Sequence, residues 1–137
     1  MEYKIFDKLP DEAKYIRETV FIKEQGFNEE FDTTDGNAKH IIIYNNGKAA
    51  AVGRYFTDDG EEYHIGRVAV LKDYRKFGYG KKIMELAESN IKKTGAKRIV
   101  LSAQLQAKGF YEKCGYTAIG SVYLDEHCEH IKMYKNI

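Results

Sequence analysis

An apolar run that ends in a glycine-containing loop constrains this 137-residue chain more than any other feature. Residues 68–71 are apolar, a short polar turn follows, and Gly78 and Gly80 then precede an amphipathic stretch. This order predicts a strand, a loop and a helix. Glycine permits close backbone approach and unusual φ values, and a helix N-terminus presents N–H groups and the positive end of the helix dipole. The segment therefore predicts a site for phosphate or diphosphate.

The spacing of this loop argues against the two common nucleotide-binding loops. A Walker A loop requires Ser or Thr after Gly-Lys, whereas Lys82 follows Gly80-Lys81. A Rossmann fingerprint requires a small residue three positions after the second glycine, and that position is Ile83. A triphosphate-binding protein is left as an alternative, which Mg²⁺-dependent binding of ATP would support.

Two motifs resemble those of the GNAT superfamily of N-acetyltransferases. Arg75-x-x-Gly78-x-Gly80 resembles the loop that binds the diphosphate of acetyl-coenzyme A. Residues 104–116 resemble the pattern N-x-x-A-x-x-x-Y-x-K-x-G-F, with Gln104 in the Asn place and Tyr116 in the Phe place. The two motifs follow each other in the family's order, which makes the pair more specific than either motif alone.

A narrower resemblance to the ElaA/YjcF-type acetyltransferases covers nearly the whole chain. It rests on residues 20–26, Asp32-x-x-Asp35, Ala38-x-His40, residues 66–70, Ala103-Gln104, Phe110-Tyr111 and His130-x-x-Met133. The chain departs from that subfamily at Asn28, where Pro is usual, and at His127-Cys128, where Gly and an aliphatic residue are usual. These departures bear on the acceptor more than on the fold.

The resemblance implies an acetyl-CoA-dependent N-acetyltransferase that transfers the acetyl group directly to a primary amine, with acetyl-CoA as cosubstrate and no metal. The alternative is a non-catalytic acyl-CoA-binding module on the same fold. The acidic segment 24–35 makes a cationic acceptor plausible. The implied acetyl-CoA-binding residues are Val68, Ala69, Val70, Arg75, Lys76, Phe77, Gly78, Tyr79, Gly80, Lys81 and Gln104.

Two residues are candidates for the catalytic chemistry. Tyr111 stands where the family places its general acid, and a phenol with a pKa of about 10 can donate a proton to a leaving thiolate. Its alternative role is packing beside Phe110. His130 lies on an expected strand, and its imidazole suits a general base, although strand histidines are often structural. Gln104 binds the pantetheine chain or only caps a strand.

Other residues compete for the role of base. An amine with a pKa of about 10 needs a base or a water chain to lose its proton at neutral pH. The further candidates are Glu24, Glu30, Asp32 and His40, each of which has a capping or solvated role as its alternative.

The segment Glu126-His127-Cys128-Glu129-His130 invites a metal interpretation. On a strand, Cys128 and His130 would share one face and His127 would point to the other. The ligands would not converge, so we expect no metal site. Cys114, beside Gly115 at a helix end, is expected to be a buried small residue.

The apolar runs and turn signals predict a mixed α/β (α+β) fold with the GNAT topology, a mostly antiparallel central sheet flanked by helices. Asn45-Asn46-Gly47-Lys48 is a strong hairpin signal, and the length fits one domain over residues 1–137. The expected strands cover residues 3–6, 41–44, 49–56, 63–71, 97–103, 117–123 and 128–134, and the expected helices begin at Pro10 and cover residues 80–94 and 105–114.

Composition indicates which classes of partner and which cellular location to expect. The chain has 22 basic and 21 acidic residues without a basic block, so we expect no nucleic-acid partner. The apolar runs are shorter than the roughly 20 residues that span a bilayer. With no apolar leader and two cysteines, we expect a cytoplasmic protein with free thiols. Edge strands near the C-terminus could pair two copies in a homodimer.

Overall fold

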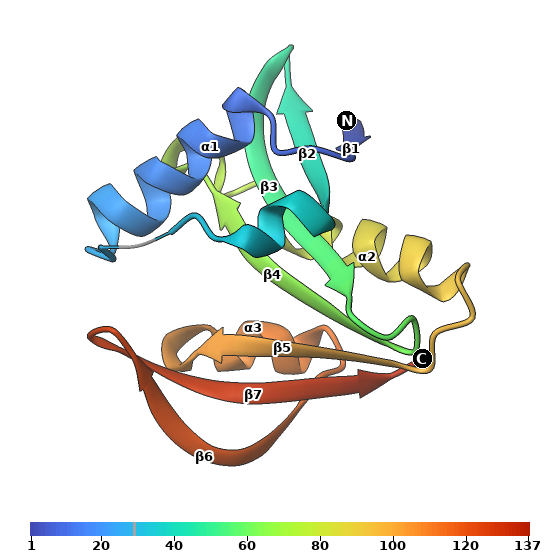
Figure 1. The fold of residues 1–137 in the computed structure, drawn as a ribbon. Coiled ribbons are helices and arrows are strands. Elements are labelled where there is room, and N and C mark those ends of the chain that lie inside the picture. Colours follow the sequence, from blue (N-terminus) through green and yellow to red (C-terminus); the bar gives the residue numbers. More distant parts are fainter. Residues whose placement is uncertain (29) are drawn as a thin grey trace.

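A single sheet organises the fold (Figure 1). Within residues 1–28 and 30–137, which this computed structural model describes, the sheet has seven strands in the order β1-β2-β3-β4-β5-β7-β6. Only the β4–β5 pair is parallel. The mixed, mostly antiparallel sheet predicted from the sequence is confirmed. The strands are β1 Glu2–Phe6, β2 Lys39–Asn45, β3 Lys48–Thr57, β4 Glu62–Val70, β5 Arg98–Gln104, β6 Thr117–Asp125 and β7 Cys128–Asn136.

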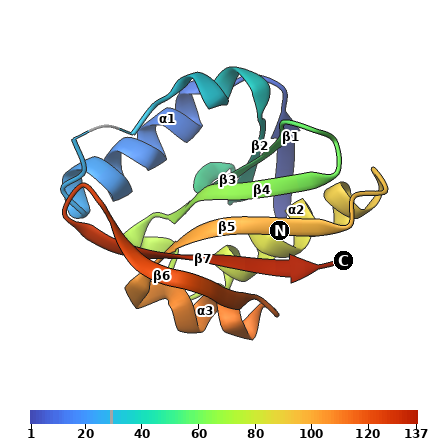
Figure 2. The ribbon, with the colours of Figure 1, turned by 60° about the horizontal axis from the view of Figure 1, so that its bottom comes forward.

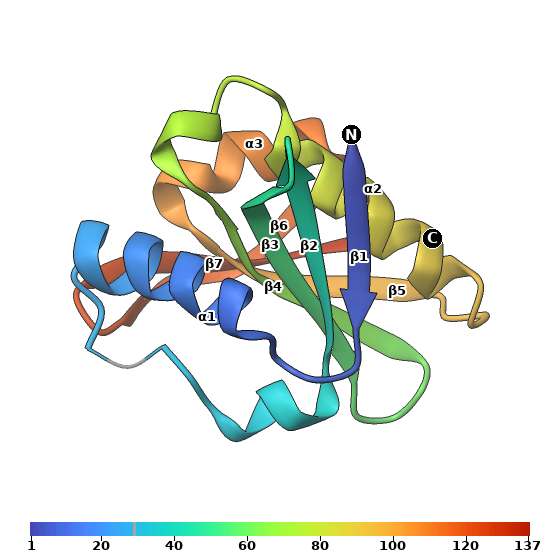
Figure 3. The same cartoon turned by 90° about the horizontal axis from the view of Figure 1, so that it is seen from above.

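Helices cover both faces of the sheet (Figure 3). The first helix packs against β3 and β4, while the two later helices lie on the other side. The α-helices are α1 Asp11–Arg17, α2 Tyr79–Lys92 and α3 Lys108–Lys113; α1 continues as the π-helix η1 Glu18–Glu24, and the 3₁₀ turns are η2 Thr33–Asn37, η3 Lys72–Tyr74 and η4 Leu105–Ala107.

Alternating side chains on the central strands supply two hydrophobic cores. Ile41 and Ile43 pack toward α2, whereas Ile42 packs toward α1 and η1, because successive strand residues point to opposite faces. The predicted apolar stripe of α2 is confirmed as core, since Ile83, Met84, Ala87 and Ile91 are all buried. We therefore assign this stripe to packing.

The helix α2 approaches β3 closely because β3 carries a glycine beneath it. A Cβ atom at Gly53 would lie 2.4 Å from Cγ2 of Ile83, which is far inside van der Waals contact. The predicted hairpin is also present: Asn46 and Gly47 join β2 to β3 with φ values of 51° and 81°. Left-handed conformations at both central positions are those of the tight hairpin turns that suit twisted strands.

The third predicted helix, over residues 105–114, is not one regular α-helix. Its first turn is the 3₁₀ turn η4, and the α-helical part begins at Lys108. Tight 3₁₀ turns are common at helix ends. Within the described residues, no helix is both long and apolar enough to cross a bilayer.

The parallel pairing of β4 with β5 is short, and this opens the middle of the sheet. It covers only Glu62↔Arg98, Tyr63↔Ile99 and His64↔Val100. Beyond these pairs the two strands diverge, as Figure 1 shows for β4 and β5, whereas β5, β7 and β6 stay side by side (Figure 2). The divergence leaves a gap between two parts of one sheet.

Candidate functional site

A cavity of about 180 Å³ lies where β4 and β5 separate. Five of the residues predicted from the sequence line it together: Glu30, Val68 on β4, Gln104 on β5, Tyr111 on α3 and His130 on β7. These residues are far apart in the sequence. The topology thus brings the two candidate catalytic side chains to one cavity with part of the predicted acetyl-CoA site.

The far half of β4 turns backbone groups toward this cleft. The N–H of Leu71 donates to the carbonyl of Ala50 on β3 at 2.9 Å. Since N–H and C=O directions alternate along a strand, Val68 and Val70 direct their backbone groups away from β3, toward the cleft. Ala69 is the exception among the predicted contacts, because it pairs with Val52 of β3 and packs in the core. We no longer expect Ala69 to contact the cosubstrate directly.

A bulge bends β4 at the edge of the cleft. The β3–β4 register shifts between Val52 and Arg54, and Arg67 has a φ of 52°. Extra residues of this kind re-aim a strand and are frequent beside functional sites. The sequence pattern gave no signal for this bulge, because an arginine rarely adopts positive φ.

The predicted glycine loop leads directly into α2. Gly78 adopts a left-handed conformation with φ 72°, and the N–H of Lys82 makes a helical bond to the Gly78 carbonyl at 3.1 Å. This is the first helical bond of α2. The N–H groups of Tyr79, Gly80 and Lys81 come earlier in the helix and have no partner within it, as is usual for the first turn of a helix. The geometry fits an anion at this end of α2.

Close packing explains the second glycine of the loop. A Cβ at Gly80 would lie 3.4 Å from Cζ of Phe110, so a small residue lets α2 approach α3. Lys76 and Phe77 are exposed on the loop, and the Phe77 ring stacks on Tyr79 with centroids 5.5 Å apart. The predicted stretch 75–81 is thus one continuous turn around the start of α2.

Tyr111 presents a phenol that holds its proton strongly. Its ring packs edge-on against Phe110 and Tyr116, with centroids 5.0 and 6.3 Å away. Burial raises the pKa of Tyr111 to about 12. The phenol therefore stays protonated at neutral pH, as a proton donor in the cavity must.

The ring of His130 is held in one orientation. Its Nδ1 lies 3.0 Å from the carbonyl oxygen of Cys128. A carbonyl oxygen can only accept, so in the neutral ring Nδ1 carries the proton and Nε2 has the lone pair. The rings of Phe27 and Tyr123 flank it, at 6.2 and 6.0 Å. His130 is therefore arranged to accept a proton through Nε2.

A chain of amide side chains crosses the cleft end of β5. Nε2 of Gln104 donates to Oε1 of Gln25 at 2.7 Å, and Nε2 of Gln106 donates to Oε1 of Gln104 at 2.7 Å. Gln25 was not among the predicted site residues, although it belongs to the segment 20–26 that resembles the subfamily. Gln104 thus links η1 to β5.

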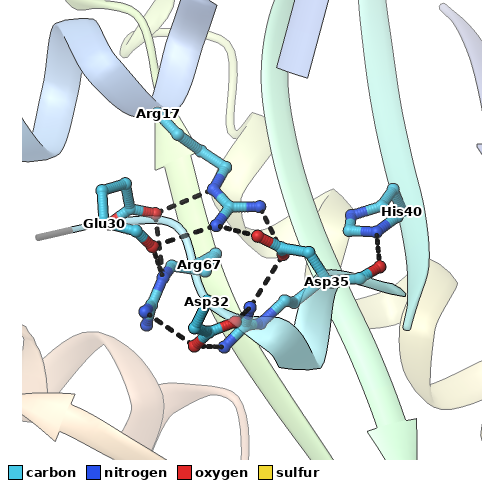
Figure 4. Close-up of polar contacts among 7 residues, drawn as sticks. Arg17, Glu30, Asp32, Asp35, His40 and Arg67 are labelled. Atoms are coloured by element: carbon cyan, nitrogen blue, oxygen red, sulfur yellow. Dashed lines mark hydrogen bonds and ion pairs between the residues drawn. The ribbon is translucent and has the colours of Figure 1, made fainter. Parts of the chain in front are cut away.

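Most of the competing acidic candidates belong to a network of three arginines and three carboxylates (Figure 4). Arg17, only 1% exposed, donates to Glu30 at 2.8 Å and to Asp35 at 2.8 Å. Arg54 donates at 2.8 Å to Asp35 as well. The network is completed by Asp32, paired with Arg54, and by Arg67, paired with Glu30 and Asp32.

The network and its burial shift the pKa values of the three carboxylates in different directions. Burial favours a raised pKa for Asp35, but hydrogen bonds from Arg17 and Arg54 outweigh it and lower the pKa to about 2. The bond from Arg54 lowers the pKa of Asp32, whereas burial raises that of Glu30 despite its arginines. Ion pairs occupy all three carboxylates, so their structural role explains them without a catalytic one.

The two remaining candidates for the base are also engaged elsewhere. Glu24 accepts from Arg75 at 2.9 and 2.8 Å. His40 is 2% exposed, its Nε2 lies 3.0 Å from the carbonyl oxygen of Asp35, and burial lowers its pKa. Of the five candidates, His130 combines a position in the cavity with a ring nitrogen that can accept a proton.

The residues with metal-binding side chains stay apart. No group of three or more His, Cys, Asp or Glu residues in the described part of the chain could hold a metal ion. The ring of His127 packs on Phe27 at 5.0 Å, while Nδ1 of His130 faces the carbonyl of Cys128. Cys114 is only half-buried, not buried as expected, since as the C-cap that follows the short helix α3 it keeps one side in solvent.

Comparisons with known proteins agree with this geometry. Residues 8–137 match the family described as "Acetyltransferase (GNAT) domain". The "Uncharacterized N-acetyltransferase YjcF" of Bacillus subtilis is 37% identical over 128 residues, which are 91% of each chain. The crystal structure of Escherichia coli ElaA superposes with a TM-score of 0.86 at 25% identity, over 98% of both chains.

A more distant structure shares the fold alone. An aminoglycoside 6'-N-acetyltransferase complexed with coenzyme A superposes with a TM-score of 0.76 at 13% identity, over 99% of this chain and 97% of that one. From its sequence relatives and its architecture together, the chain belongs to the GNAT acetyltransferase family, in its ElaA/YjcF-like subfamily, and is an acyl-CoA-dependent acyltransferase.

Proposed function

We propose that the protein is an N-acetyltransferase that transfers the acetyl group of acetyl-CoA directly to the primary amine of a small molecule. The observation that carries this proposal is the early end of the β4–β5 ladder, with Tyr111 and His130 lining the cavity that it opens. One candidate acid and one candidate base thus share a cavity.

The residues present fit acetyl-CoA as a cosubstrate. Backbone groups of Val68 and Val70 would bind the amides of the pantetheine chain, in the way that an extended ligand adds to a sheet edge. The N–H groups from Gly78 to Lys81, with the lysines beside them, would hold the diphosphate. Gln104 lines the same cavity and offers an amide to the same chain.

The chemistry divides between the two side chains. Acetyl-CoA supplies an acyl group activated as a thioester. Nε2 of His130 takes a proton from the acceptor ammonium, whose pKa of about 10.4 keeps it charged at neutral pH. The neutral amine then attacks the acyl carbon as the carbon–sulfur bond breaks, and the second proton of the nitrogen leaves to solvent as the amide forms. The phenol of Tyr111 donates toward the departing sulfur, which stabilises the thiolate.

Direct transfer requires no enzyme nucleophile. The free thiols of the described chain, Cys114 and Cys128, are poor candidates for an acyl carrier, because burial raises the pKa of both and only the thiolate attacks efficiently. Neither thiol is among the residues that line the cavity with Tyr111 and His130.

Calorimetry and thiol-release assays test the proposal together. Acetyl-CoA should bind to the purified protein, whereas ATP with Mg²⁺ should not, and at least one primary amine should stimulate CoA release. Absence of acetyl-CoA binding contradicts the proposal. Binding without turnover across a broad amine panel would instead favour a non-catalytic acyl-CoA-binding module.

A further inference from the structure

A second cavity, of about 440 Å³, adjoins the cleft at the point where β4 and β5 begin to diverge. It shares Ile65, Gly66, Arg67 and Ser102 with the cavity that contains Tyr111 and His130. Its volume lies in the range typical of small-molecule sites. A molecule in this space would therefore reach the candidate catalytic side chains without crossing the sheet.

The charges that line this second cavity are all positive. Arg54, Arg67 and Lys132 line it, and no Asp or Glu among the described residues does. The two arginines are already paired with the carboxylates of the network. Lys132 is exposed and has no ion pair or hydrogen bond to any residue that the structure describes. Its charge is therefore available to a ligand.

A buried donor adds to this positive character. Nε of Arg54 is buried and has no hydrogen-bond partner in the described chain, and Arg54 as a whole is 6% exposed. A Cβ at Gly66 would lie 4.0 Å from this nitrogen, at ordinary van der Waals distance. An unpaired buried N–H is unfavourable, so this part of the Arg54 guanidinium keeps its positive character uncompensated beneath the cavity lining.

Flat side chains form another part of the lining. The rings of Phe56 and His64 stack with centroids 4.9 Å apart and an interplanar angle of 11°. Tyr123 stands between the two cavities: its hydroxyl is hydrogen-bonded to Ser102, and its ring stacks on His130. These surfaces suit a ligand that has a flat or apolar body.

The carboxylates of segment 24–35 that the structure describes already have cationic partners. Glu24, Glu30, Asp32 and Asp35 are paired with arginines. Because arginines already compensate these charges, a cationic acceptor would gain less from them than the number of acids in the segment suggests.

We propose that this cavity is the acceptor subsite and that it selects primary amines which carry an anionic group, such as a carboxylate, on a flat or apolar body. The amine lies at His130 and the anion at Lys132. These residues are two apart on β7 and share a face, roughly 7 Å apart along the strand. The spacing favours an amine several bonds away from its anion, and the inference rests on the proposed acetyl transfer.

Three rigid amines of one shape test the charge preference. They are 4-(aminomethyl)benzoate, benzylamine and 4-(aminomethyl)benzylamine, which place a carboxylate, a hydrogen and a second ammonium at the same position. With acetyl-CoA in excess, kcat/KM from thiol release should be about tenfold higher for the benzoate than for benzylamine, the size expected for one charge-assisted contact. The diamine should be the poorest. Equal values, or a preference for the diamine, would overturn the subsite.

A charge reversal assigns the preference to one residue. In Lys132→Glu the ratio of kcat/KM for the benzoate to that for benzylamine should fall below one. Lys93→Glu, at the exposed C-cap of α2, makes the same change in net charge away from the cavity and should keep the wild-type ratio. An unchanged ratio in Lys132→Glu overturns the role of this lysine.

A binding measurement separates the subsite from the chemistry. In an NMR titration with 4-(aminomethyl)benzoate, the ring signals of His64 should shift, whereas those of His127, which lies outside the cavity, should not. If His64 responds while no amine releases CoA, the acetyl-transfer proposal fails and the anion-binding subsite stands. If His64 does not respond, the subsite is wrong even if transfer occurs.

Discussion

Nη2 of Arg75 donates to both carboxylate oxygens of Glu24, at 2.9 and 2.8 Å, while Nε of the same side chain donates to the carbonyl of Val70 at 3.0 Å. The first residue of the glycine loop is therefore tied both to the end of η1 and to the end of β4. This arrangement gives Arg75 a positioning role in addition to its charge.

Arg75→Ala should weaken acetyl-CoA binding by about three- to tenfold, because it releases the end of β4 and removes a partly exposed ion pair. Calorimetry at fixed ionic strength measures this change. Lys72→Ala in the same loop should change the dissociation constant less. If both variants bind acetyl-CoA like the wild type, neither the clamp nor the charge of Arg75 contributes.

Tyr111→Phe should lower kcat by about 10² or more, the usual range for a lost general acid, with little change in acetyl-CoA affinity. Because burial raises the pKa of Tyr111 to about 12, the wild-type phenol stays protonated throughout a titration from pH 6 to pH 10. The kcat of the wild type should therefore show no alkaline loss from this group. An unaltered kcat in Tyr111→Phe would remove the residue from the mechanism.

His130→Gln should lower kcat/KM for the amine by about 10²-fold, because the variant lacks the lone pair of Nε2 that accepts the proton. His127→Gln is the matched control, since its ring packs on Phe27 in the neighbouring turn. Steady-state rates at a fixed pH of 7.5 measure both variants. A kcat/KM in His130→Gln equal to that of the wild type would assign the base to another group.

Asp35→Asn should reduce the free energy of unfolding by about 3 kcal/mol at pH 7, because Arg17 and Arg54 lose a buried partner. The folded-state pKa of Asp35 lies below its ordinary value of 3.8, at about 2. Its stabilisation is therefore present above about pH 4 and is lost as the pH falls toward 2.

Urea unfolding at pH 7 and at pH 2.5 checks this sign. The difference in the free energy of unfolding between the wild type and Asp35→Asn should be smaller at pH 2.5 than at pH 7. Asp11→Asn, an exposed acid in the first turn of α1, is the control for general charge effects. A difference that is constant with pH would show that the carboxylate charge does not matter.

Gly53→Ala should destabilise the fold by about 1–3 kcal/mol, because the added methyl overlaps the buried side chain of Ile83 at 2.4 Å and forces α2 away from β3. Gly36→Ala is the matched control, since a Cβ there meets nothing within 4 Å. Thermal unfolding compares the two. Equal melting temperatures would show that α2 adjusts without strain.

Local sequence patterns predicted the order of elements because each depends on neighbouring residues. The turn at Asn46-Gly47 and the buried stripe around Ile83 and Met84 are examples. The bulge at Arg67 and the π-helix η1 were not predicted, because both depend on packing between distant segments. The single domain over residues 1–137, the homodimer and the cellular location stay predictions.

The arginine network shows where a local interpretation fails. Arg17 follows the buried Ile16 on the inner face of α1, and Arg54 lies within the apolar strand β3. Charged residues at core positions are rarely buried without a partner. Their placement in apolar patterns was therefore a signal that the acids of segment 30–35 would be internal partners.

Because the proposed contacts of Val68 and Val70 with the cosubstrate come from the backbone, the side chains at these two positions can change without altering those contacts. An extended ligand that binds along these two residues acts as an eighth strand, recognised by the spacing of its amides and not by side-chain chemistry. Substitutions among β-branched residues at positions 68 and 70 should thus leave cosubstrate recognition intact. The acceptor side depends on individual side chains such as Lys132, so one scaffold can keep its acyl donor while its acceptor diverges.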